Sequence, residues 1–390
     1  MAQTIDQAKT GGFENVAVIG FGLIGASFAA ALRAANPSAQ VMAVDTDLAT
    51  RVEAVNRGWA TATAAPDAVE FRAFIEDGCD LVVLATPVSV VEGYLKDLAE
   101  WGYRGIITDT ASTKSRIIEM AAHTLPYPQN FVPGHPMAGS EKNGIVGARA
   151  DLFKGAYWIL CPDADTPAEH FTRLHELITG IGARVISLPR EQHDAAVAVV
   201  SHVPHFTASS LVQLAVRHAK GQDSLMRLAA GGFKDSTRIA AGSPELWCGI
   251  AFDNKDALLG GLREMQGIIG QFADALEAGD RAMLTSLLAE AADARRALPA
   301  AWLPCTERLL EVRIPMEDRP GVVAEVTTIT SKVGCNIQSI EIDHVTEDSA
   351  VLSLVLTDEG DIGKLSAHLI NAGFSVSFSP LAPKEHTHVG

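Results

Sequence analysis

The chain has 390 residues, of which 47% are hydrophobic and 20% charged, a composition typical of a globular protein with two or three domains. The net charge of −16 disfavours any general affinity for nucleic acids or anionic membranes. The five cysteines form no C-x-x-C pair, which predicts reduced thiols, a cytoplasmic location and no metal framework.

Two features argue against export and membrane insertion. Residues 1–12 lack the apolar core of a signal peptide. The longest clean apolar run, residues 195–200, is far shorter than a bilayer-crossing helix requires. We therefore expect no membrane partner.

The first elements in the chain form a dinucleotide-binding pattern. Residues 16–19 are an apolar run typical of a buried parallel strand, and residues 23–35 are expected to form a helix. Between them, Gly20 permits a tight turn, Gly22 lets a pyrophosphate approach the backbone, and Gly25 lets the helix pack on the strand. The helix N-terminus then offers free N–H groups to the phosphates.

A second apolar run, residues 41–44, ends in Asp45, where this pattern needs a carboxylate for the ribose 2′-hydroxyl. No arginine follows Asp45 directly, so NAD is expected in preference to NADP. The alternative is a glycine turn in some other βαβ unit. Strand, glycines, helix, second strand and acid in register favour the cofactor site.

The alternation of strands and helices continues and predicts a doubly wound parallel sheet up to Pro189. Strands are expected at residues 81–85, 106–108, 131–132, 157–160 and 184–188, the last two closing the sheet. Polar stretches follow two of the strands, at residues 109–114 and 134–141. Because the carboxyl ends of parallel strands meet at one edge of a sheet, we expect the site there.

Residues 190–299 are rich in alanine and leucine with helical periodicity, and Pro204 is expected to kink a long helix at 193–219. Later helices are expected to begin near Ser224, Pro244, Leu258 and Ala282. So apolar a segment must bury a face against the first domain or a partner chain, which predicts a homodimer or larger assembly.

A linker at residues 299–304 leads to a small separate unit. Its expected order is strand, helix, strand, strand, helix and strand, with the last helix at 362–372 and the last strand at 374–378. This βαββαβ order is ferredoxin-like. The predicted domains are therefore 1–189, an α/β Rossmann domain; 190–299, an all-helical dimerisation domain; and 305–382, a ferredoxin-like domain.

Several residues in the polar stretches can carry chemistry. His135 is a candidate general base, since an imidazole titrates near neutrality, but a structural histidine is equally compatible. Ser112 taken alone reads as a helix cap or turn residue. Ser201 and His205 lie one helical turn apart, which fits a pocket lining. His202 and His205, three residues apart, can suggest a metal site, but no glutamate of an H-E-x-x-H motif and no cysteine ligand accompanies them, so no metal is expected.

The segment at residues 231–238 combines a glycine turn with charged residues. Arg238 can hold a carboxylate bidentately, or it can pair with Asp235 inside the protein. Trp247 can shelter a substrate ring, or it can be a core tryptophan.

Five motifs together resemble one family. They read G-F-G-L-I-G-A-S, D-T-A-S-T-K, G-H-P-M-A-G-S-E, S-H-V-P-H and G-G-F-K-D-S-T-R-I-A. In this order, over about residues 16–299, they are similar to the prephenate dehydrogenases of tyrosine biosynthesis. The resemblance implies NAD-dependent oxidation of prephenate to 4-hydroxyphenylpyruvate with loss of carbon dioxide. One departure is Ala111, where the family more often has glycine.

The resemblance also implies roles for individual residues. His135 accepts the hydroxyl proton, Ser112 holds the hydroxyl and orients His135, and Arg238 holds a substrate carboxylate. The implied pocket residues are Ser201, His205, Asp235 and Trp247. The implied cofactor-binding residues are Gly20, Gly22, Leu23, Ile24, Gly25, Asp45, Thr86 and Pro87.

The C-terminal motifs D-R-P-G-V-V-A-E-V and G-C-N-I are similar to ACT domains, which bind amino acids and regulate enzymes. The resemblance implies that the turn from Asp318 to Gly321 and the amide of Asn336 lie close together at an interface between two such units, where they can hold tyrosine. The alternative is a domain that only assembles subunits.

Two other functions stay open. The substrate can be arogenate, alone or together with prephenate as in a cyclohexadienyl dehydrogenase, because no residue decides the side-chain amino group. From a different class, the chain can be a cofactor-binding amino-acid sensor without catalysis. The presence of Ser112, His135 and Arg238 argues against the sensor.

Overall fold

The computed structural model describes residues 11–139, 144–219, 230–297, 309–346, 349–356 and 362–381. Contacts between residues divide the chain into two compact units, Met1–Gly270 and Gln271–Gly390. The helices that follow residue 190 therefore belong, up to Gly270, to the same unit as the α/β part. The three domain limits expected from the sequence stay predictions.

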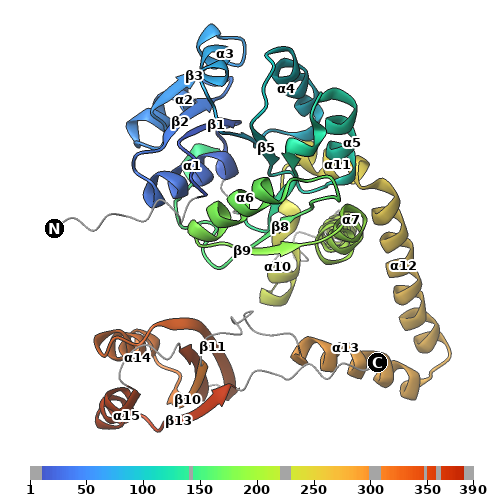
Figure 1. The fold of residues 1–390 in the computed structure, drawn as a ribbon. Coiled ribbons are helices and arrows are strands. Elements are labelled where there is room, and N and C mark those ends of the chain that lie inside the picture. The colour runs from blue at the N-terminus through green and yellow to red at the C-terminus, as the bar shows by residue number, and fades with distance from the viewer. Residues whose placement is uncertain are drawn as a thin grey trace. The chain divides into compact units, whose positions relative to one another are not determined.

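The first unit is built on a six-stranded parallel sheet with the order β3-β2-β1-β4-β5-β6 (Figure 1). The strands are β1 (Asn15–Ile19), β2 (Gln40–Val44), β3 (Ala62–Ala64), β4 (Leu81–Leu84), β5 (Ile106–Asp109) and β6 (Phe131–Val132). This order confirms the predicted Rossmann arrangement, and the winding direction reverses between β1 and β4. Ligands of such sheets bind beyond the carboxyl ends of the strands at that point.

Both faces of this sheet are covered by helices. The helices are α1 (Leu23–Ala35), α2 (Leu48–Asn56), α3 (Val69–Glu76), α4 (Val88–Glu100), α5 (Ser115–Thr124) and α6 (Ala168–Gly180). Along β1, Val16 and Val18 point into a core shared with α1 and α6, while Ala17 and Ile19 point into a core shared with α3, α4 and α5. Two buried faces explain why the strands are continuous apolar runs.

The expectation that residues 157–160 and 184–188 close the main sheet is wrong. β7 (Gly134–Pro136), β8 (Tyr157–Leu160) and β9 (Arg184–Ser187) form a separate three-stranded sheet, in which β7 and β8 are antiparallel. Only Pro133 separates β6 from β7, so the chain has no room for the crossover that another parallel strand would need. The short strand β3 was not predicted either.

One long helical stretch follows. It consists of α7 (Arg190–Val197), a π-helical turn (Ala198–His202) and α8 (Val203–Ala219). The irregularity expected at Pro204 is this π turn. Pro204 lacks the N–H that the carbonyl four residues earlier would accept, and a wider turn accommodates that loss.

By length and composition the stretch Arg190–Ala219 could cross a membrane, which the run-length argument had missed. It carries the buried polar residues His193, Asp194, His202 and His205, and a single helix of this kind is weak evidence for a membrane span. That no membrane is involved stays a prediction.

The remaining helices of this unit are α10 (Gly231–Thr237), a 3₁₀ turn (Arg238–Ala241), α11 (Pro244–Asp253) and α12 (Lys255–Glu277), which runs on into the second unit. The helices predicted from Pro244 and Leu258 correspond to α11 and α12. The helix predicted from Ser224 begins outside the described residues.

The second unit contains α13 (Arg281–Ala297) and a four-stranded antiparallel sheet of order β11-β12-β10-β13. Its elements are β10 (Leu309–Glu317), α14 (Val322–Lys332), β11 (Ile337–Thr346), β12 (Ser349–Leu356), α15 (Ile362–Asn371) and β13 (Ser377–Leu381). The βαββαβ order is the predicted one. The last strand begins later than expected, at Ser377, and Phe374 ahead of it is buried in the core.

Candidate active site

The glycine loop between β1 and α1 has the geometry of a phosphate cradle. Gly20 has a φ of +88°, in the left-handed region, and a Cβ there would lie 2.6 Å from the carbonyl oxygen of Ala85. A Cβ on Gly25 would collide with the carbonyl oxygen of Gly20. A Cβ on Gly22 would meet nothing within 4 Å. Gly20 and Gly25 are thus required by the fold, whereas Gly22 borders open space.

Asp45 lies beside this loop. Its carboxylate accepts hydrogen bonds from the backbone N–H of Phe21 at 2.7 Å and of Asp47 at 2.9 Å. Phe21 belongs to the glycine loop, so the acid at the end of β2 is fixed against it. This is the placement that ribose recognition needs.

Thr86 and Pro87 follow β4, on the other side of the reversal point. The Thr86 methyl lies next to Gly20, and its Oγ1 is buried without a hydrogen-bond partner among the described residues. Pro87 begins α4. At α1, Leu23 and Ile24 open the helix, and no side chain caps its N-terminus. These features fit a dinucleotide, whose phosphates would accept hydrogen bonds from the free N–H groups at the start of α1.

Ser112 lies in the loop after β5, and a buried ion pair fixes that loop. Asp109 and Lys114 are both fully buried and form a salt bridge. The Asp109 carboxylate accepts from Gly134 N at 3.0 Å, and Lys114 Nζ donates to Gly134 O at 2.6 Å. The pair therefore ties the Ser112 loop to the residue that precedes His135.

Ala111 does not strain this loop. Its N–H donates to Asp109 Oδ2 at 2.9 Å, and none of the described non-glycine residues has a positive φ. The departure from the family's more common glycine is therefore tolerated here.

His135 lies in the short strand β7 and is buried, where the sequence had predicted a loop. Its Nδ1 is 2.8 Å from Nε2 of His193, which is fully buried on α7. Burial, followed by the nearby Lys114 cation, holds the pKa of His135 well below its usual value. The expectation of a pKa near neutrality is thus wrong. The environment of His135 therefore favours its neutral form.

Asp194 connects this pair to the rest of the site. His193 Nδ1 lies 2.8 Å from Asp194 Oδ1, and the same carboxylate accepts from the N–H groups of Lys114 and Ser115, both at 2.8 Å. Burial alone would raise the pKa of Asp194, but hydrogen bonds from His193, Ser115 and Lys114 outweigh it and lower the pKa to about 2. The carboxylate is therefore ionised and caps the N-terminus of α5.

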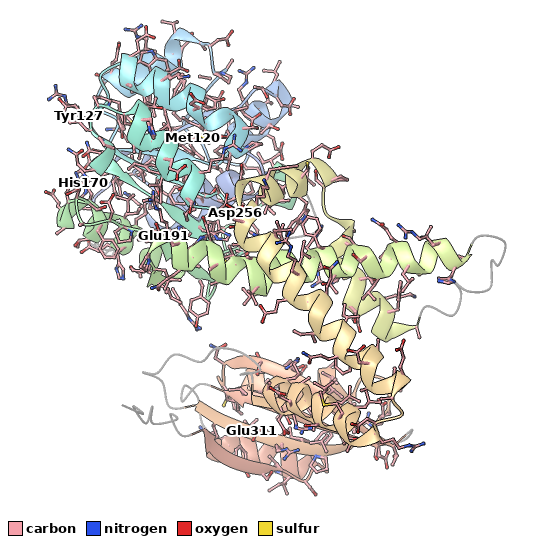
Figure 2. The ribbon with its side chains drawn as sticks, turned by 90° about the vertical axis from the view of Figure 1, so that its right-hand side faces the viewer. Met120, Tyr127, His170, Glu191, Asp256 and Glu311 are labelled. Carbon is pink, nitrogen blue, oxygen red and sulfur yellow. The ribbon has the colours of Figure 1, made fainter. Side chains whose placement is uncertain are left out.

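Asn254, between α11 and α12, links Asp194 to a further group of aromatic side chains. Its amide donates to the carbonyl of Asp194 at 2.7 Å and lies 3.3 Å from His202 Nδ1. His202 in turn packs edge-on against Trp247. Figure 2 labels Glu191 on α7 and Asp256 on α12, the two helices that bring Asp194 and Asn254 together.

His205 and Trp247 form a stacked pair, with ring centroids 3.5 Å apart and an interplanar angle of 11°. Gly242 lies against this stack, since a Cβ there would be 2.6 Å from Trp247 Nε1. The predicted pocket residues His205 and Trp247 are thus joined to His135 through a continuous series of contacts.

The other predicted pocket residues are less buried. Ser201 is half-buried in the π turn, and Arg238 and Asp235 are exposed. The segment that carries Asp235 and Arg238, α10 with the 3₁₀ turn, packs against α8.

Comparisons with known proteins address this site directly. Residues 28–187 match the family model described as prephenate dehydrogenase, nucleotide-binding domain, and residues 189–290 match prephenate dehydrogenase, dimerization domain. The prephenate dehydrogenase of Bacillus subtilis is 32% identical over 351 residues, which cover 89% of this chain and 93% of the relative. The chain belongs to the prephenate dehydrogenase family.

Two further members of this family group are similar. The cyclohexadienyl dehydrogenase of Zymomonas mobilis is 34% identical over 73% of this chain and 96% of its own length. The crystal structure of Aquifex aeolicus prephenate dehydrogenase with hydroxyphenyl propionate and NAD+ has a TM-score of 0.68 and 27% identity, covering 73% of this chain and 98% of that one. NAD is therefore the cofactor.

Sequence reasoning missed the residues that hold the site together. These are Asp109, Lys114, His193, Asp194, His202 and Asn254. The local signal was weak, because His193 and Asp194 end a polar run, R-E-Q-H-D, at the start of the helix. Polar residues on a buried helix face need partners, and such residues mark a site or a network.

The C-terminal candidates are placed apart within one chain. Asp318 follows β10, where Glu317 pairs with Ser349, whereas Asn336 precedes β11, where Ile337 pairs with Leu356. Ser349 and Leu356 are the two ends of β12, so the turn and the amide lie at opposite ends of the sheet. Gly321 has a φ of +88° and precedes α14. A site that uses both would need two copies of the unit.

Proposed function

We propose that this protein is an NAD-dependent dehydrogenase that converts prephenate to 4-hydroxyphenylpyruvate and carbon dioxide. The observation that carries the proposal is the buried His135, whose Nδ1 contacts His193 and whose strand β7 follows the last strand of the nucleotide-binding sheet, in a chain of this family. The B. subtilis relative that matches 89% of the chain is a prephenate dehydrogenase.

His135 takes the proton from the ring hydroxyl while hydride leaves the ring carbon that bears this hydroxyl. Bound NAD supplies the hydride acceptor. Loss of the ring carboxylate as carbon dioxide leaves its electron pair in the ring, which becomes aromatic, and His135 can return the proton to the phenolic oxygen. General-base catalysis of this kind contributes typically about 10²–10⁴ in rate.

The remaining residues hold the substrate. Ser112 binds the ring hydroxyl and orients His135, and Arg238 binds a carboxylate. The His205–Trp247 stack offers a flat, half-buried surface beside which a ring can lie, and this supports the predicted pocket role of both residues. Ser201 and Asp235 complete the pocket in this proposal.

The test is a spectrophotometric assay of NADH formation with prephenate. Wild-type protein is expected to turn over, and His135→Asn is expected to lower kcat by about 10²–10⁴ while the Kd for NAD stays the same. Near-normal kcat in His135→Asn would remove this residue from the mechanism. No turnover of prephenate or arogenate by the wild type would favour the amino-acid sensor.

Arogenate is the second candidate substrate, alone or with prephenate. A cyclohexadienyl dehydrogenase is among the relatives, and the arogenate dehydrogenase of Synechocystis is structurally similar, with a TM-score of 0.61 and 28% identity. The same assay with arogenate decides which substrate is preferred, by the ratio of the kcat/KM values for prephenate and arogenate.

The C-terminal unit is, in this proposal, an ACT domain that binds tyrosine between two copies of the chain. The βαββαβ order and the left-handed Gly321 at the start of α14 support this, and the separation of Asp318 and Asn336 within one chain calls for two copies. Calorimetry compares the full chain with one ending at Pro304. Equal stoichiometry and affinity for tyrosine in both would place any tyrosine site outside this unit.

A cytoplasmic location is also proposed. The support is that Cys79, Cys161 and Cys248, among the described residues, are free thiols.

A further inference from the structure

The hydrogen-bond series from Asp194 to His135 has a defined direction. An ionised carboxylate only accepts, so Asp194 must receive the proton of His193 Nδ1. A neutral imidazole carries a proton on only one ring nitrogen, so Nε2 of a neutral His193 is an acceptor. The 2.8 Å contact to His135 Nδ1 must therefore be donated by His135.

We propose that His193 and Asp194 are positioning residues that fix the proton of His135 on Nδ1 and leave the lone pair on Nε2 facing the substrate. The tautomer is a property of the free protein, whereas the benefit to catalysis rests on the proposed function. A histidine's tautomer and ring orientation are set by the hydrogen bond of its other nitrogen, which is the general basis of this assignment.

The same carboxylate also fixes the loop that carries Ser112. Asp194 binds the N–H groups of Lys114 and Ser115, at the junction of that loop and α5. The Asp109–Lys114 pair fixes the other side of His135 through Gly134. Asp194 on α7 therefore fixes the position of His135 relative to the loop that carries Ser112.

The arrangement also accommodates the charge that catalysis creates. When Nε2 accepts the substrate proton, His135 becomes an imidazolium whose Nδ1–H stays bound to His193. The groups that influence its charge are the Lys114 cation, His193 and His202, which oppose it, and Asp194, which favours it. Asp194 is thus the one carboxylate among these groups that stabilises the protonated base.

The first experiment observes the tautomer without substrate. The full chain labelled with ¹⁵N-histidine is studied by NMR at about pH 8, and the His135 signals are assigned from their loss in His135→Asn. Wild-type His135 is expected to be protonated on Nδ1. A proton on Nε2 in the wild type would overturn the proposal whatever the enzymatic activity.

The second experiment compares two substitutions of the linking histidine. His193→Gln keeps an oxygen that can accept from His135 Nδ1, whereas His193→Phe keeps the bulk but no acceptor. His193→Phe is expected to lose about 10²–10⁴ in kcat with KM for prephenate changed by less than about threefold, and His193→Gln is expected to lose clearly less. Equal losses in both would show that the acceptor is irrelevant and would overturn the proposal.

His170→Gln is the matched control, because His170 is a half-buried histidine on α6 outside the site, labelled in Figure 2. Its kcat is expected to equal that of the wild type. If the wild type turns over neither prephenate nor arogenate, the proposed function fails, while the NMR result still decides the tautomer. If His193→Phe does not fold, the wild-type spectrum and His193→Gln remain as tests.

Discussion

Asp45 accepts hydrogen bonds at both carboxylate oxygens, one from the N–H of Phe21 in the glycine loop and one from the N–H of Asp47, the residue before α2. Each oxygen retains a lone pair that a ribose hydroxyl can use, and the negative charge repels a 2′-phosphate. We therefore expect Asp45 to be the residue that selects NAD over NADP.

We expect kcat/KM to be at least about tenfold higher with NAD than with NADP, equivalent to about 1.4 kcal/mol. Asp45→Ala should reduce this preference, because the repulsion of the 2′-phosphate is lost. Asp47→Ala is the control, since Asp47 caps α2 through Ala49 and Thr50 and should affect stability alone. Equal efficiency with both cofactors in the wild type would contradict the assignment of Asp45.

The buried histidines predict how stability depends on pH. Burial lowers the pKa of His202 to about 4, and burial also lowers the pKa values of His135 and His205. The unfolded chain therefore binds more protons than the fold as the pH falls below about 6.5, so stability is full above that value and declines towards pH 4.

For His202 the loss is on the order of 3 kcal/mol across this window. Denaturant unfolding at stepped pH values measures it, and His202→Gln should flatten the pH dependence in that range. An unchanged slope in His202→Gln would show that this residue does not resist protonation in the fold. The acid Asp194 contributes later, because its folded pKa is about 2 and its stabilisation is lost only as the pH falls through that value.

At the scale of elements, the β1–α1 junction contains one glycine that the packing requires and another that is expected to serve cofactor binding. Gly25 is where the helix touches the backbone of Gly20, whereas Gly22 borders open space. The same substitution should therefore affect stability at Gly25 and NAD binding at Gly22.

Gly25→Ala should lower the free energy of unfolding by roughly 1–3 kcal/mol, because its Cβ forces α1 away from β1. Gly22→Ala should leave stability nearly unchanged and raise the Kd for NAD at least about tenfold, because the methyl group occupies the path of the pyrophosphate. Thermal unfolding and NAD calorimetry on both variants check this. Undiminished NAD binding by Gly22→Ala would mean that the phosphates lie elsewhere.

At the scale of the whole molecule, the helices after residue 190 expose much apolar surface. Leu214 on α8 is 56% exposed and Ile269 on α12 is 56% exposed. The matched family model for residues 189–290 is a dimerization domain. Together these observations support a dimer formed through this helical segment.

Light scattering at micromolar concentration should therefore give the mass of a dimer or larger assembly. Ile269→Asp should weaken the assembly, because a charge is then buried in an apolar interface. Val69→Asp is the control, because Val69 is 73% exposed on α3, outside the helical segment. A monomeric wild type would contradict the predicted dimer.

The sequence alone predicted much of the fold because the relevant signals are local. The apolar runs of β1, β2, β4 and β5, the glycine spacing and the acid at residue 45 are each contained in a few consecutive residues. The motif around His135 was likewise visible. Short-range periodicity and spacing report on backbone conformation, and they are unaffected by what packs against them.

Only the tertiary structure decided which residues complete the site and which sheet β8 and β9 join. His135 and His193 are 58 residues apart in sequence, and the Lys114 N–H and Asp194 are 80 apart. Such contacts depend on how α5, α7 and β7 pack, and burial then shifts the His135 pKa away from its ordinary value. No local pattern encodes a partner at that distance, because the pairing arises only when the core brings the elements together.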